Sequence, residues 1–471
     1  MKEQTRTRQL RFLVCAVVLT LVFEGLVRKM VEGELKTAIF FAKDFLLVWM
    51  TFLVIRIPKP GAILPLWRTY LWVVILFAPV VLATLIRDPL LAVFGAERYL
   101  LMPIVAFGAY GAFQDAEPGV LVSYLKKLGL LLLPTTAIAL LQLRLPANHW
   151  TNLSVSGEMM AEFAAGGRLR VCSSFAFVSQ FGMFLTMQVG VCAVLLSNFK
   201  QMPRIQKILY GSLPFALLLA SYSTGSRGVV LGNAAVVAIA VLILMVKGKL
   251  KGLLKFGVVA VALLLSFFTL RSIFPEAFEA YAERESGRFL TLSDENRERT
   301  TQAFTRLSSS TAPMTLFGYG LGVMSNGSEK VSSYAASWRN GGFWTESDPA
   351  TTLFEGGIYL MVVWYGFRMW VIVHTTRRVM QGIAPEFVIP LAFIQGHVAL
   401  SGAVATLAIQ PPVAIWWWIT VGVSTLLWQK SINKTGSVPH SAPSETAALS
   451  AVSRIRGRSA YAEQLHRNSP E

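Results

Sequence analysis

Long apolar runs, separated by short polar segments, recur along nearly the whole chain. About 20 apolar residues cross the hydrocarbon of a bilayer as one helix. The pattern therefore predicts an all-α polytopic membrane protein with about twelve transmembrane helices. The predicted spans are residues 10–27, 37–56, 68–87, 89–112, 124–143, 173–196, 207–224, 228–246, 254–271, 350–367, 383–405 and 411–429.

The longest polar interruption, residues 272–349, lies between the ninth and tenth predicted spans. A loop of this length is usually functional or disordered. Its helical spacing and its aromatic residues favour a folded cap over the outer ends of the helices. The chain then divides into nine helices in 1–271, this cap, three helices in 350–430 and a tail in 431–471. The tail is basic, rich in Ser and Ala and poor in aromatics, so we expect it to be disordered.

Charge supports this organisation and predicts an orientation. Only 15% of residues are charged, against about a quarter in a soluble domain, while 54% are hydrophobic. Basic residues collect in alternate loops, which places both termini in the cytoplasm under the positive-inside rule. The net charge of +17 is then explained without a nucleic-acid partner. The first apolar run lacks a small-residue cleavage site and is expected to be the first span.

Charged and strongly polar residues within the spans fall in the halves predicted to face outward. Intramembrane charge marks a functional site by default. Transporters place their sites near the midplane, often between repeated halves, and no repeat is visible here. The distribution therefore favours a polar cavity open to the outside. Its members include Glu24, Lys43, Asp44, Glu97, Arg98, Gln142, Arg227, Glu355 and His397.

Each of these residues also has a structural interpretation. Glu24 and Arg28 are four apart, so they can pair on one helix face. Lys43 and Asp44 are adjacent, so we expect them to point in different directions and to find partners elsewhere. His397 has the ordinary interpretation of a hydrogen-bonded histidine inside the bundle.

Arg227 stands in the run Ser-Tyr-Ser-Thr-Gly-Ser-Arg-Gly at 221–228, between two predicted spans near the outer face. A guanidinium flanked by small hydroxyl residues and glycines is suited to binding an anion. The alternative is that Arg227 only extends to the membrane interface.

Several short segments resemble the bacterial O-antigen ligase and O-antigen polymerase family, in its exopolysaccharide-polymerase branch. The resemblance covers residues 10–430 in order and topology. It rests on Gly-Ser-Arg-Gly (225–228), Phe-Glu-Gly-Leu-Val-Arg-Lys (23–29), Lys-Asp-Phe-Leu-Leu (43–47), Leu-Leu-Gln (140–142), His-Trp-Thr-Asn (149–152), Arg-Val-Cys-Ser-Ser-Phe-Ala-Phe (170–177), Gly-Tyr-Gly-Leu-Gly (318–322), Glu-Ser-Asp-Pro (346–349) and Phe-Glu-Gly-Gly (354–357).

The resemblance implies a glycosyltransferase of the bacterial inner membrane that uses a glycan on undecaprenyl diphosphate, on the periplasmic side. No cofactor and no metal is then expected, since arginines would stabilise the diphosphate leaving group. Arg227 is the first candidate for that role, with Arg98, Arg168, Arg170 and Arg288 as candidates for further contacts. Chain-length regulators and export proteins would be further partners.

The acceptor hydroxyl needs a general base within hydrogen-bond reach. Glu346 and Asp348 are the catalytic candidates, and N-capping of the next helix is the structural alternative. Glu355, Lys43 and Asp44 are expected to line the polar cavity, where Glu355 would bind Arg227 or orient a sugar.

Four functions stay open at this point. A polymerase joins repeat units on lipid carriers, and a ligase delivers the finished glycan to another acceptor. The family's ligases carry a histidine in the long outer loop, and none occurs between His149 and His374, which favours a polymerase. A polysaccharide or lipid transporter and a scaffold subunit of a secretion complex are the alternatives from other classes.

Overall fold

A computed structural model describes residues 2–58, 61–157, 170–249, 267–286, 315–341 and 347–436. Within these ranges the protein is helical and has no strands. Ten of the helices described there are long and apolar enough to cross a membrane. These spans are Gln4–Met30, Gly33–Ile55, Gly61–Arg87, Pro89–Phe113, Gly119–Arg144, Val178–Ser197, Arg227–Val246, Asp348–Met380, Pro385–Val404 and Pro411–Thr435.

Several spans are built from more than one helical segment, because prolines and glycines interrupt them. The helices that build the bundle are α1 (Lys2–Met30), α2 (Gly33–Ile55), η1 (Gly61–Ile63), α3 (Leu64–Arg87), α4 (Pro89–Ala96), η2 (Glu97–Leu101), α5 (Ile104–Phe113), α6 (Pro118–Leu130), α7 (Leu132–Arg144), α8 (Val178–Ser197), α9 (Arg204–Gly211), α10 (Leu213–Ser223), α11 (Arg227–Val246), α17 (Asp348–Met380), α18 (Pro385–Val404) and α19 (Pro411–Thr435). The connections carry η3 (Trp150–Asn152), η5 (Phe199–Gln201), α13 (Pro275–Ser286), α15 (Ser328–Val331) and α16 (Ser333–Asn340).

Three predicted elements differ in the structure. The span expected at 350–367 continues to Met380 as α17. The span expected at 207–224 is divided at Ser212 into α9 and α10, with Pro214 at the start of α10, so neither piece reaches the length of a span. The last helix continues to Thr435, beyond the predicted boundary at 430. The span expected at 254–271 and the tail from 437 onward fall mostly or wholly outside the described residues.

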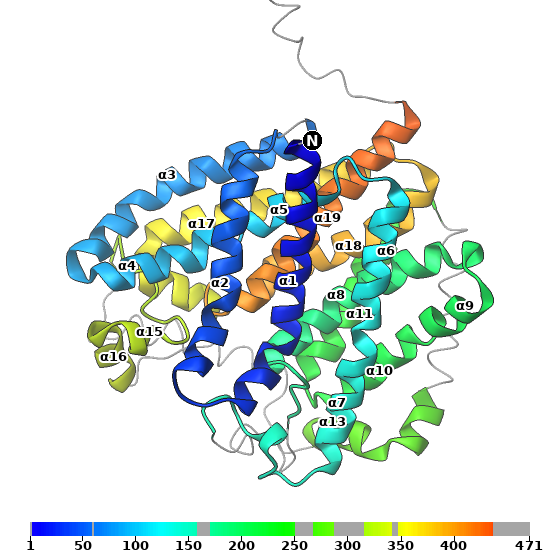
Figure 1. Ribbon diagram of the computed structural model, residues 1–471, viewed down its shortest axis with the longest axis horizontal. Coiled ribbons are helices and arrows are strands. Elements are labelled where there is room, and N and C mark those ends of the chain that lie inside the picture. The colour runs from blue at the N-terminus through cyan, green and yellow to red at the C-terminus, as the bar shows by residue number, and fades with distance from the viewer. Residues whose placement is uncertain are drawn as a thin grey trace, which may run out of the picture.

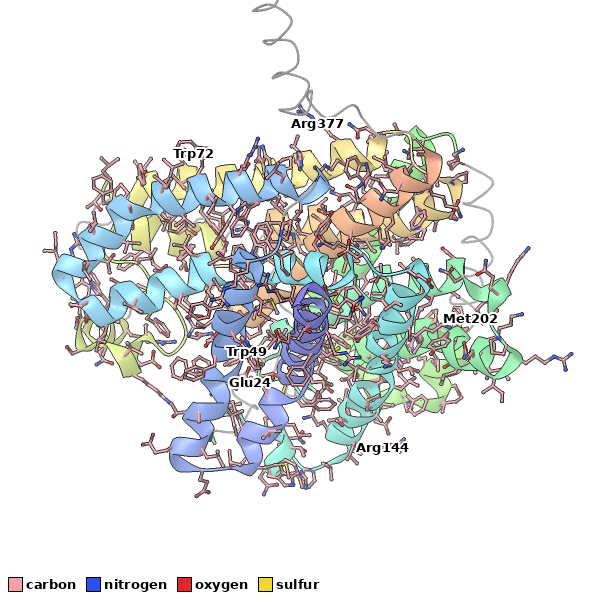
Figure 2. The ribbon with its side chains drawn as sticks, turned by 45° about the horizontal axis from the view of Figure 1, so that its top comes forward. Glu24, Trp49, Trp72, Arg144, Met202 and Arg377 are labelled. Carbon is pink, nitrogen blue, oxygen red and sulfur yellow. The ribbon has the colours of Figure 1, made fainter. Side chains whose placement is uncertain are left out.

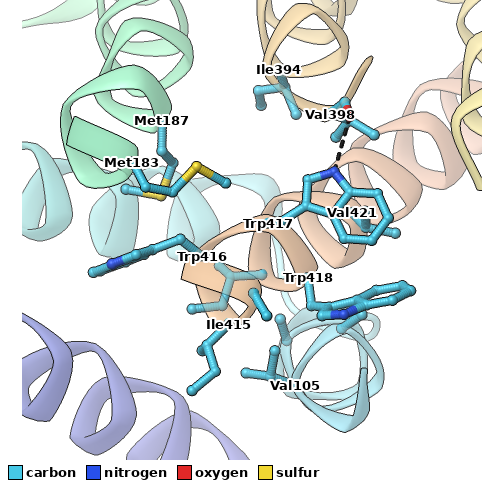
Figure 3. Close-up of a cluster of buried hydrophobic side chains, with 14 of the residues drawn as sticks. Val105, Met183, Met187, Ile394, Val398, Ile415, Trp416, Trp417, Trp418 and Val421 are labelled. Carbon is cyan, nitrogen blue, oxygen red and sulfur yellow. Dashed lines mark hydrogen bonds between the residues drawn. The ribbon is translucent and has the colours of Figure 1, made fainter. Parts of the chain in front are cut away.

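Helices α8 and α19 form the centre of the bundle. In their most apolar stretches 89% and 94% of residues are buried, against 28% for α3 and for α11, which therefore lie at the periphery. Consecutive tryptophans of α19, Trp416 to Trp418, fill the space between α5, α8 and α18 (Figure 3). Trp417 Nε1 donates to the carbonyl of Val398 at 2.9 Å, which satisfies its indole within this apolar region.

The outer surface of the bundle is apolar, as a lipid-facing surface must be. Large apolar side chains on α1, α2, α3 and α11 are solvent-exposed in the isolated chain, which soluble proteins avoid over areas of this extent. Together with the ten apolar helices they indicate a multi-pass membrane protein. Examples are Phe12, Trp49, Phe52, Trp72, Ile75, Ile86, Leu242 and Val246.

The two ends of the bundle are different. The N-terminus and the end of α19 lie at one edge, which we call the terminal face, and the α1–α2 turn, α15 and α16 lie at the other, which we call the loop face (Figure 1). Glu24 and Arg144 lie toward the loop face, whereas Arg377 lies at the terminal face (Figure 2). Lys247 Nζ donates to Val379 and Gln381 carbonyls, so α11 and α17 end together at the terminal face.

Candidate functional site

Six charged residues from three helical segments lie between the α1–α2 turn and the middle of the bundle, and we call them the charge cluster. Glu24 and Arg28 lie on α1, Lys43 and Asp44 on α2, and Glu97 and Arg98 on η2. Arg28 Nη1 donates to Glu24 Oε1 at 3.0 Å, as the spacing of four residues allows. Arg98 Nε lies 3.1 Å from Glu97 Oε2.

The expectation that Lys43 and Asp44 cannot meet was wrong. Lys43 Nζ lies 3.2 Å from Asp44 Oδ2 and also donates to the carbonyl of Phe40 at 2.5 Å. A lysine carries four methylene groups, so its amine reaches a neighbour whose Cβ points elsewhere. The Asp44 side chain also hydrogen-bonds the side chain of Glu97, so it links α2 to η2.

The ring of Phe40 is the centre of the cluster. The guanidinium carbons of Arg28 and Arg98 lie 4.8 and 5.5 Å from its centroid, and Lys43 Nζ lies 4.1 Å from it. Arg98 also lies 4.3 Å from the ring of Phe94. Cation–π contacts of this kind offset part of the cost of burying cations. The connection ahead of α15 covers the ring, because a Cβ on Gly327 would be 3.8 Å from it.

Arg98 is buried with its terminal nitrogens unpaired. Its side chain is 1% exposed, its Nε lies in the ion pair with Glu97, and neither terminal guanidinium nitrogen has a hydrogen-bond partner among the described residues. Glu97 also hydrogen-bonds the side chain of Asp44. Buried polar atoms are nearly always paired, so the two terminal nitrogens of Arg98 are exceptional.

The end of α1 packs directly on the segment 170–177. A Cβ on Gly25 would be 2.1 Å from the backbone carbon of Phe175, so only glycine allows this approach. Leu26 N donates to the carbonyl of Ser174 at 2.8 Å. Lys29 Nζ donates to the carbonyl of Thr151 at 2.8 Å. Segments more than 120 residues apart in the chain are thereby joined beside the charge cluster.

Gln142 organises the same segment from α7. Its amide nitrogen donates to the carbonyls of Thr151 and Ser173, and its amide oxygen accepts from Ser173 N at 2.8 Å. Ser173 has φ +55°, a left-handed conformation that a residue other than glycine adopts only when its surroundings impose it. Three of the segments singled out in the sequence, 140–142, 149–152 and 170–177, therefore meet in one contact network. Arg170, at the start of this segment, is partly buried.

Two further segments singled out in the sequence, 318–322 and 354–357, meet at a break in α17. Gly357 has φ 65° and ψ −164°, a conformation that only glycine adopts readily, and the helix is interrupted there. The turn 318–322 docks at this break, where Gly320 N donates to the carbonyl of Glu355 at 3.0 Å and Tyr359 N to that of Leu316 at 3.1 Å. A Cβ on Gly318 would be 2.5 Å from the backbone of Glu355.

Glu355 holds this turn in place rather than binding Arg227. Its side chain is fully buried, Oε1 accepts from Met324 N at 2.8 Å, and Oε2 accepts from the Tyr99 hydroxyl at 2.7 Å. Tyr99 follows Arg98 on η2, so this contact links the charge cluster to the turn and to α17.

Asp348 is also occupied by structural contacts. Oδ2 accepts from Arg368 Nη1 in a buried ion pair and from the Tyr365 hydroxyl at 3.1 Å, and Oδ1 accepts from Ala408 N at 2.8 Å. Arg368 in turn donates to the carbonyls of Gly402 and Ala405. The N-cap of α17 is Ser347, so capping does not describe Asp348 either. Its carboxylate joins α17 to the α18–α19 connection.

Arg227 is the first residue of α11, at the end of that helix opposite to Lys247 and hence toward the loop face. It is 9% exposed, and its Nε has no hydrogen-bond partner in the described structure. The turn before it has Gly225 at φ +60°, with Ser226 N donating to Thr224 Oγ1 at 3.1 Å.

The predicted site residues thus fall into groups. The structure brings Lys43, Asp44 and Arg98 together and places Asp348 and Glu355 in separate contacts on α17. Glu346, Arg168 and Arg288 lie outside the described residues. Sequence reasoning gave no role in the site to Tyr99, whose partner Glu355 lies on α17, or to Arg368, which pairs with Asp348 within α17. Within the described ranges no group of three His, Cys, Asp or Glu residues is arranged to hold a metal ion.

Comparison with known proteins adds no relative: no family model, no curated protein and no solved structure matches the chain.

Proposed function

We propose that this protein is a glycosyltransferase that joins glycan units carried on undecaprenyl diphosphate, at the outer face of the bacterial cytoplasmic membrane. The observation that carries the proposal is the uncompensated guanidinium of Arg227. The chain's resemblance to O-antigen polymerases, expressed in segments that the fold brings into contact, supports the same function.

Arg227 differs from the other buried arginines of the described chain. Arg98 contacts Glu97, Arg368 pairs with Asp348, and Arg378 lies 4.5 Å from the ring of Trp428. Arg227 has no ion pair, ring contact or hydrogen bond in the described structure. A buried charge without a partner is costly, so it calls for an anionic ligand that the isolated chain lacks.

The surroundings of Arg227 suit a phosphate group. The N–H groups of Val229 and Val230 bond the Ser226 carbonyl, which leaves those of Arg227 and Gly228 at the start of α11, where the helix dipole favours negative charge. Four Ser or Thr residues and one glycine, Gly225, precede it within 221–226. A guanidinium contacts two phosphate oxygens in a fixed geometry.

In the proposed reaction one bond to the donor sugar forms as another breaks. The acceptor hydroxyl oxygen forms a bond to the anomeric carbon of the donor glycan, while the bond from that carbon to the diphosphate oxygen breaks. The diphosphate leaves with the electron pair, and Arg227 stabilises the charge it gains. The hydroxyl proton passes to a base. Because both carboxylate oxygens of Asp348 are engaged, Glu346 is our candidate for that base.

We infer the orientation from the basic residues at the terminal face. Lys247, Arg377 and Arg378 lie at the terminal face, which we assign to the cytoplasm by the positive-inside rule. The loop face, with Arg227 and the charge cluster, is then periplasmic, where lipid-linked glycans are assembled in this class of reaction.

The test is a profile of lipid-linked and surface glycans in a strain that lacks the gene. Single repeat units that accumulate on the lipid carrier, with long chains lost, support a polymerase. Full-length chains retained on the carrier support the ligase alternative. Unchanged pools in a strain that makes the glycan contradict glycosyl transfer and favour a transporter or a scaffold.

A further inference from the structure

Helix α9 lies on the terminal side of the bundle. The segment 170–177, which leads into α8, packs on the end of α1 near the loop face. Because α8 is long enough to cross the membrane, it ends at the opposite, terminal face. The short helices η5 and α9 follow there, and α10 then leads back to the turn before Arg227. The position of α9 is therefore where the bundle meets the membrane surface on the terminal side.

One side of α9 is apolar and uncovered. Ile205 and Ile208, which are one helical turn apart, are 80% and 77% exposed. The other side is attached to α6, where Lys126 Nζ donates to Gln206 Oε1 at 2.9 Å and lies 5.7 Å from the ring centroid of the buried Tyr210. In a membrane protein, uncovered isoleucines on an amphipathic helix are expected to contact hydrocarbon rather than water.

A basic stripe lies beside these isoleucines. At about 100° per residue, Arg204 and Lys207 occupy adjacent turns of one stripe of α9, and the isoleucines occupy the neighbouring stripe. Lys200 in η5 is exposed, as Arg204 is. None of α6, α8, α9 and α10 contains an Asp or Glu. None of these three cations, nor Lys126, forms an ion pair with a described residue. Their charges are therefore open to an anion from outside the chain.

A phospholipid with an anionic headgroup has both chemical parts that this surface requires. Its phosphate oxygens accept hydrogen bonds from guanidinium and ammonium groups, and its acyl chain covers aliphatic side chains. Basic residues near an anionic membrane surface attract such headgroups, and apolar side chains on the same helix add buried area. A free anion would contact only the cations and would leave both isoleucines uncovered.

We propose that α9 forms a binding site for an anionic phospholipid of the leaflet at the terminal face. The headgroup phosphate contacts Arg204 and Lys207, and an acyl chain covers Ile205 and Ile208. The proposal goes beyond glycosyl transfer and does not depend on it. Because α10 connects α9 to the turn before Arg227, the lipid fixes the terminal-face end of the helix that precedes the proposed diphosphate site.

The test is photolabelling of the full-length protein in phosphatidylcholine nanodiscs. The two probes are phosphatidylglycerol and phosphatidylcholine with identical acyl chains and a diazirine at the same acyl position. After irradiation and digestion with pepsin, adducts on residues 199–211 are quantified by mass spectrometry. The wild type is compared with the double variant Arg204→Gln, Lys207→Gln, and the midpoint of thermal unfolding is recorded for every protein.

The matched control is the double variant Arg68→Gln, Arg377→Gln. It removes the same number of charges from the terminal-face ends of α3 and α17, where both arginines are exposed. The far end of α3 lies at the loop face, because Arg87 donates to the carbonyl of Gly318.

We expect the phosphatidylglycerol probe to label residues 199–211 of the wild type more than the phosphatidylcholine probe does. The Arg204→Gln, Lys207→Gln variant should lose about fivefold of the phosphatidylglycerol labelling for each cation removed and should keep its phosphatidylcholine labelling. The Arg68→Gln, Arg377→Gln control should label as the wild type does. Equal labelling of the wild type by the two probes would overturn the anionic site and mean that α9 contacts lipid without selecting it.

Further outcomes test the parts of the site. An equal loss in the control would assign the preference to the net charge of the terminal face and overturn a site on α9. The double variant Ile205→Ser, Ile208→Ser should lower labelling by both probes, and retained labelling would overturn the acyl-chain contact. If the Arg204→Gln, Lys207→Gln variant does not fold, Arg204→Gln alone decides, because Arg204 is exposed.

Discussion

The hydroxyl of Tyr99 donates a 2.7 Å hydrogen bond to the carboxylate of Glu355, joining two residues 256 positions apart in a fully buried contact. Through it η2, which carries Arg98, is connected to the break in α17 and to the glycine-rich turn that docks there. The positions of the candidate site and of the outer connection therefore depend on each other.

Loss of the Tyr99 hydroxyl should destabilise the protein. Tyr99→Phe leaves Glu355 Oε2 buried without its donor, which costs about 1–3 kcal/mol. Tyr359→Phe is the control, because its hydroxyl bonds the Leu76 carbonyl at an exposed position. The thermal midpoint in detergent should fall clearly for Tyr99→Phe and little for Tyr359→Phe. Equal midpoints for the two variants would mean that the Tyr99–Glu355 contact does not stabilise the fold.

The Asp348–Arg368 pair should behave as a structural ion pair. Asp348→Leu leaves a buried arginine uncompensated, at a cost of about 3–5 kcal/mol. Asp348→Leu combined with Arg368→Met removes both charges and should be more stable than Asp348→Leu alone. Additive losses in this double-mutant cycle, measured by thermal unfolding, would show that the two side chains are not coupled.

Gly25 should tolerate no side chain. Gly25→Ala puts a Cβ 2.1 Å from the backbone of Phe175 and must displace the segment 170–177, at a cost of about 1–3 kcal/mol or more. Gly366→Ala, also within a helix, meets nothing within 4 Å and is the control. Membrane abundance and thermal midpoint should fall for the first and stay unchanged for the second; normal values for Gly25→Ala would refute the close approach.

The hydrogen bonds of Asp88 predict that the stability of the folded protein decreases at acid pH. The Ser332 hydroxyl, followed by the backbone N–H groups of Leu91 and Leu90, lowers the pKa of Asp88 below its usual 3.8. A lowered pKa stabilises the folded state above about pH 4, and the gain disappears as pH falls through the folded-state value. Asp88→Asn keeps a side-chain oxygen that can cap α4 but does not titrate. The wild type should therefore unfold at a higher temperature than Asp88→Asn at pH 6, and the difference should shrink toward pH 3. A difference independent of pH would contradict this role.

The sequence predicted the helical architecture because apolar length is a local property. Most predicted spans overlap helices of the structure, and the spacing of Glu24 and Arg28 correctly indicated a pair. The division of 207–224 at Ser212 was not predicted, since hydropathy averages over such a break.

The contacts of the site were less predictable. The lysine–aspartate pair on α2 depends on side-chain length, which helix geometry alone does not describe. The docking of Gly25 on Phe175 and of the glycine-rich turn on Glu355 joins segments far apart in the chain. Glycines and buried charges marked these positions as unusual, but their partners became evident only in the fold.

The central claim is that Arg227 binds the diphosphate of a glycan carrier, and complementation of a deletion strain tests it most directly. Strains expressing wild type, Arg227→Ala and Arg227→Lys at matched membrane abundance are compared by the lengths of their lipid-linked and surface glycans. We expect Arg227→Ala to lose long chains and accumulate single repeat units, and Arg227→Lys to retain only part of the activity, because lysine keeps the charge without the two-pronged geometry. Long chains at wild-type level with Arg227→Ala would contradict the account.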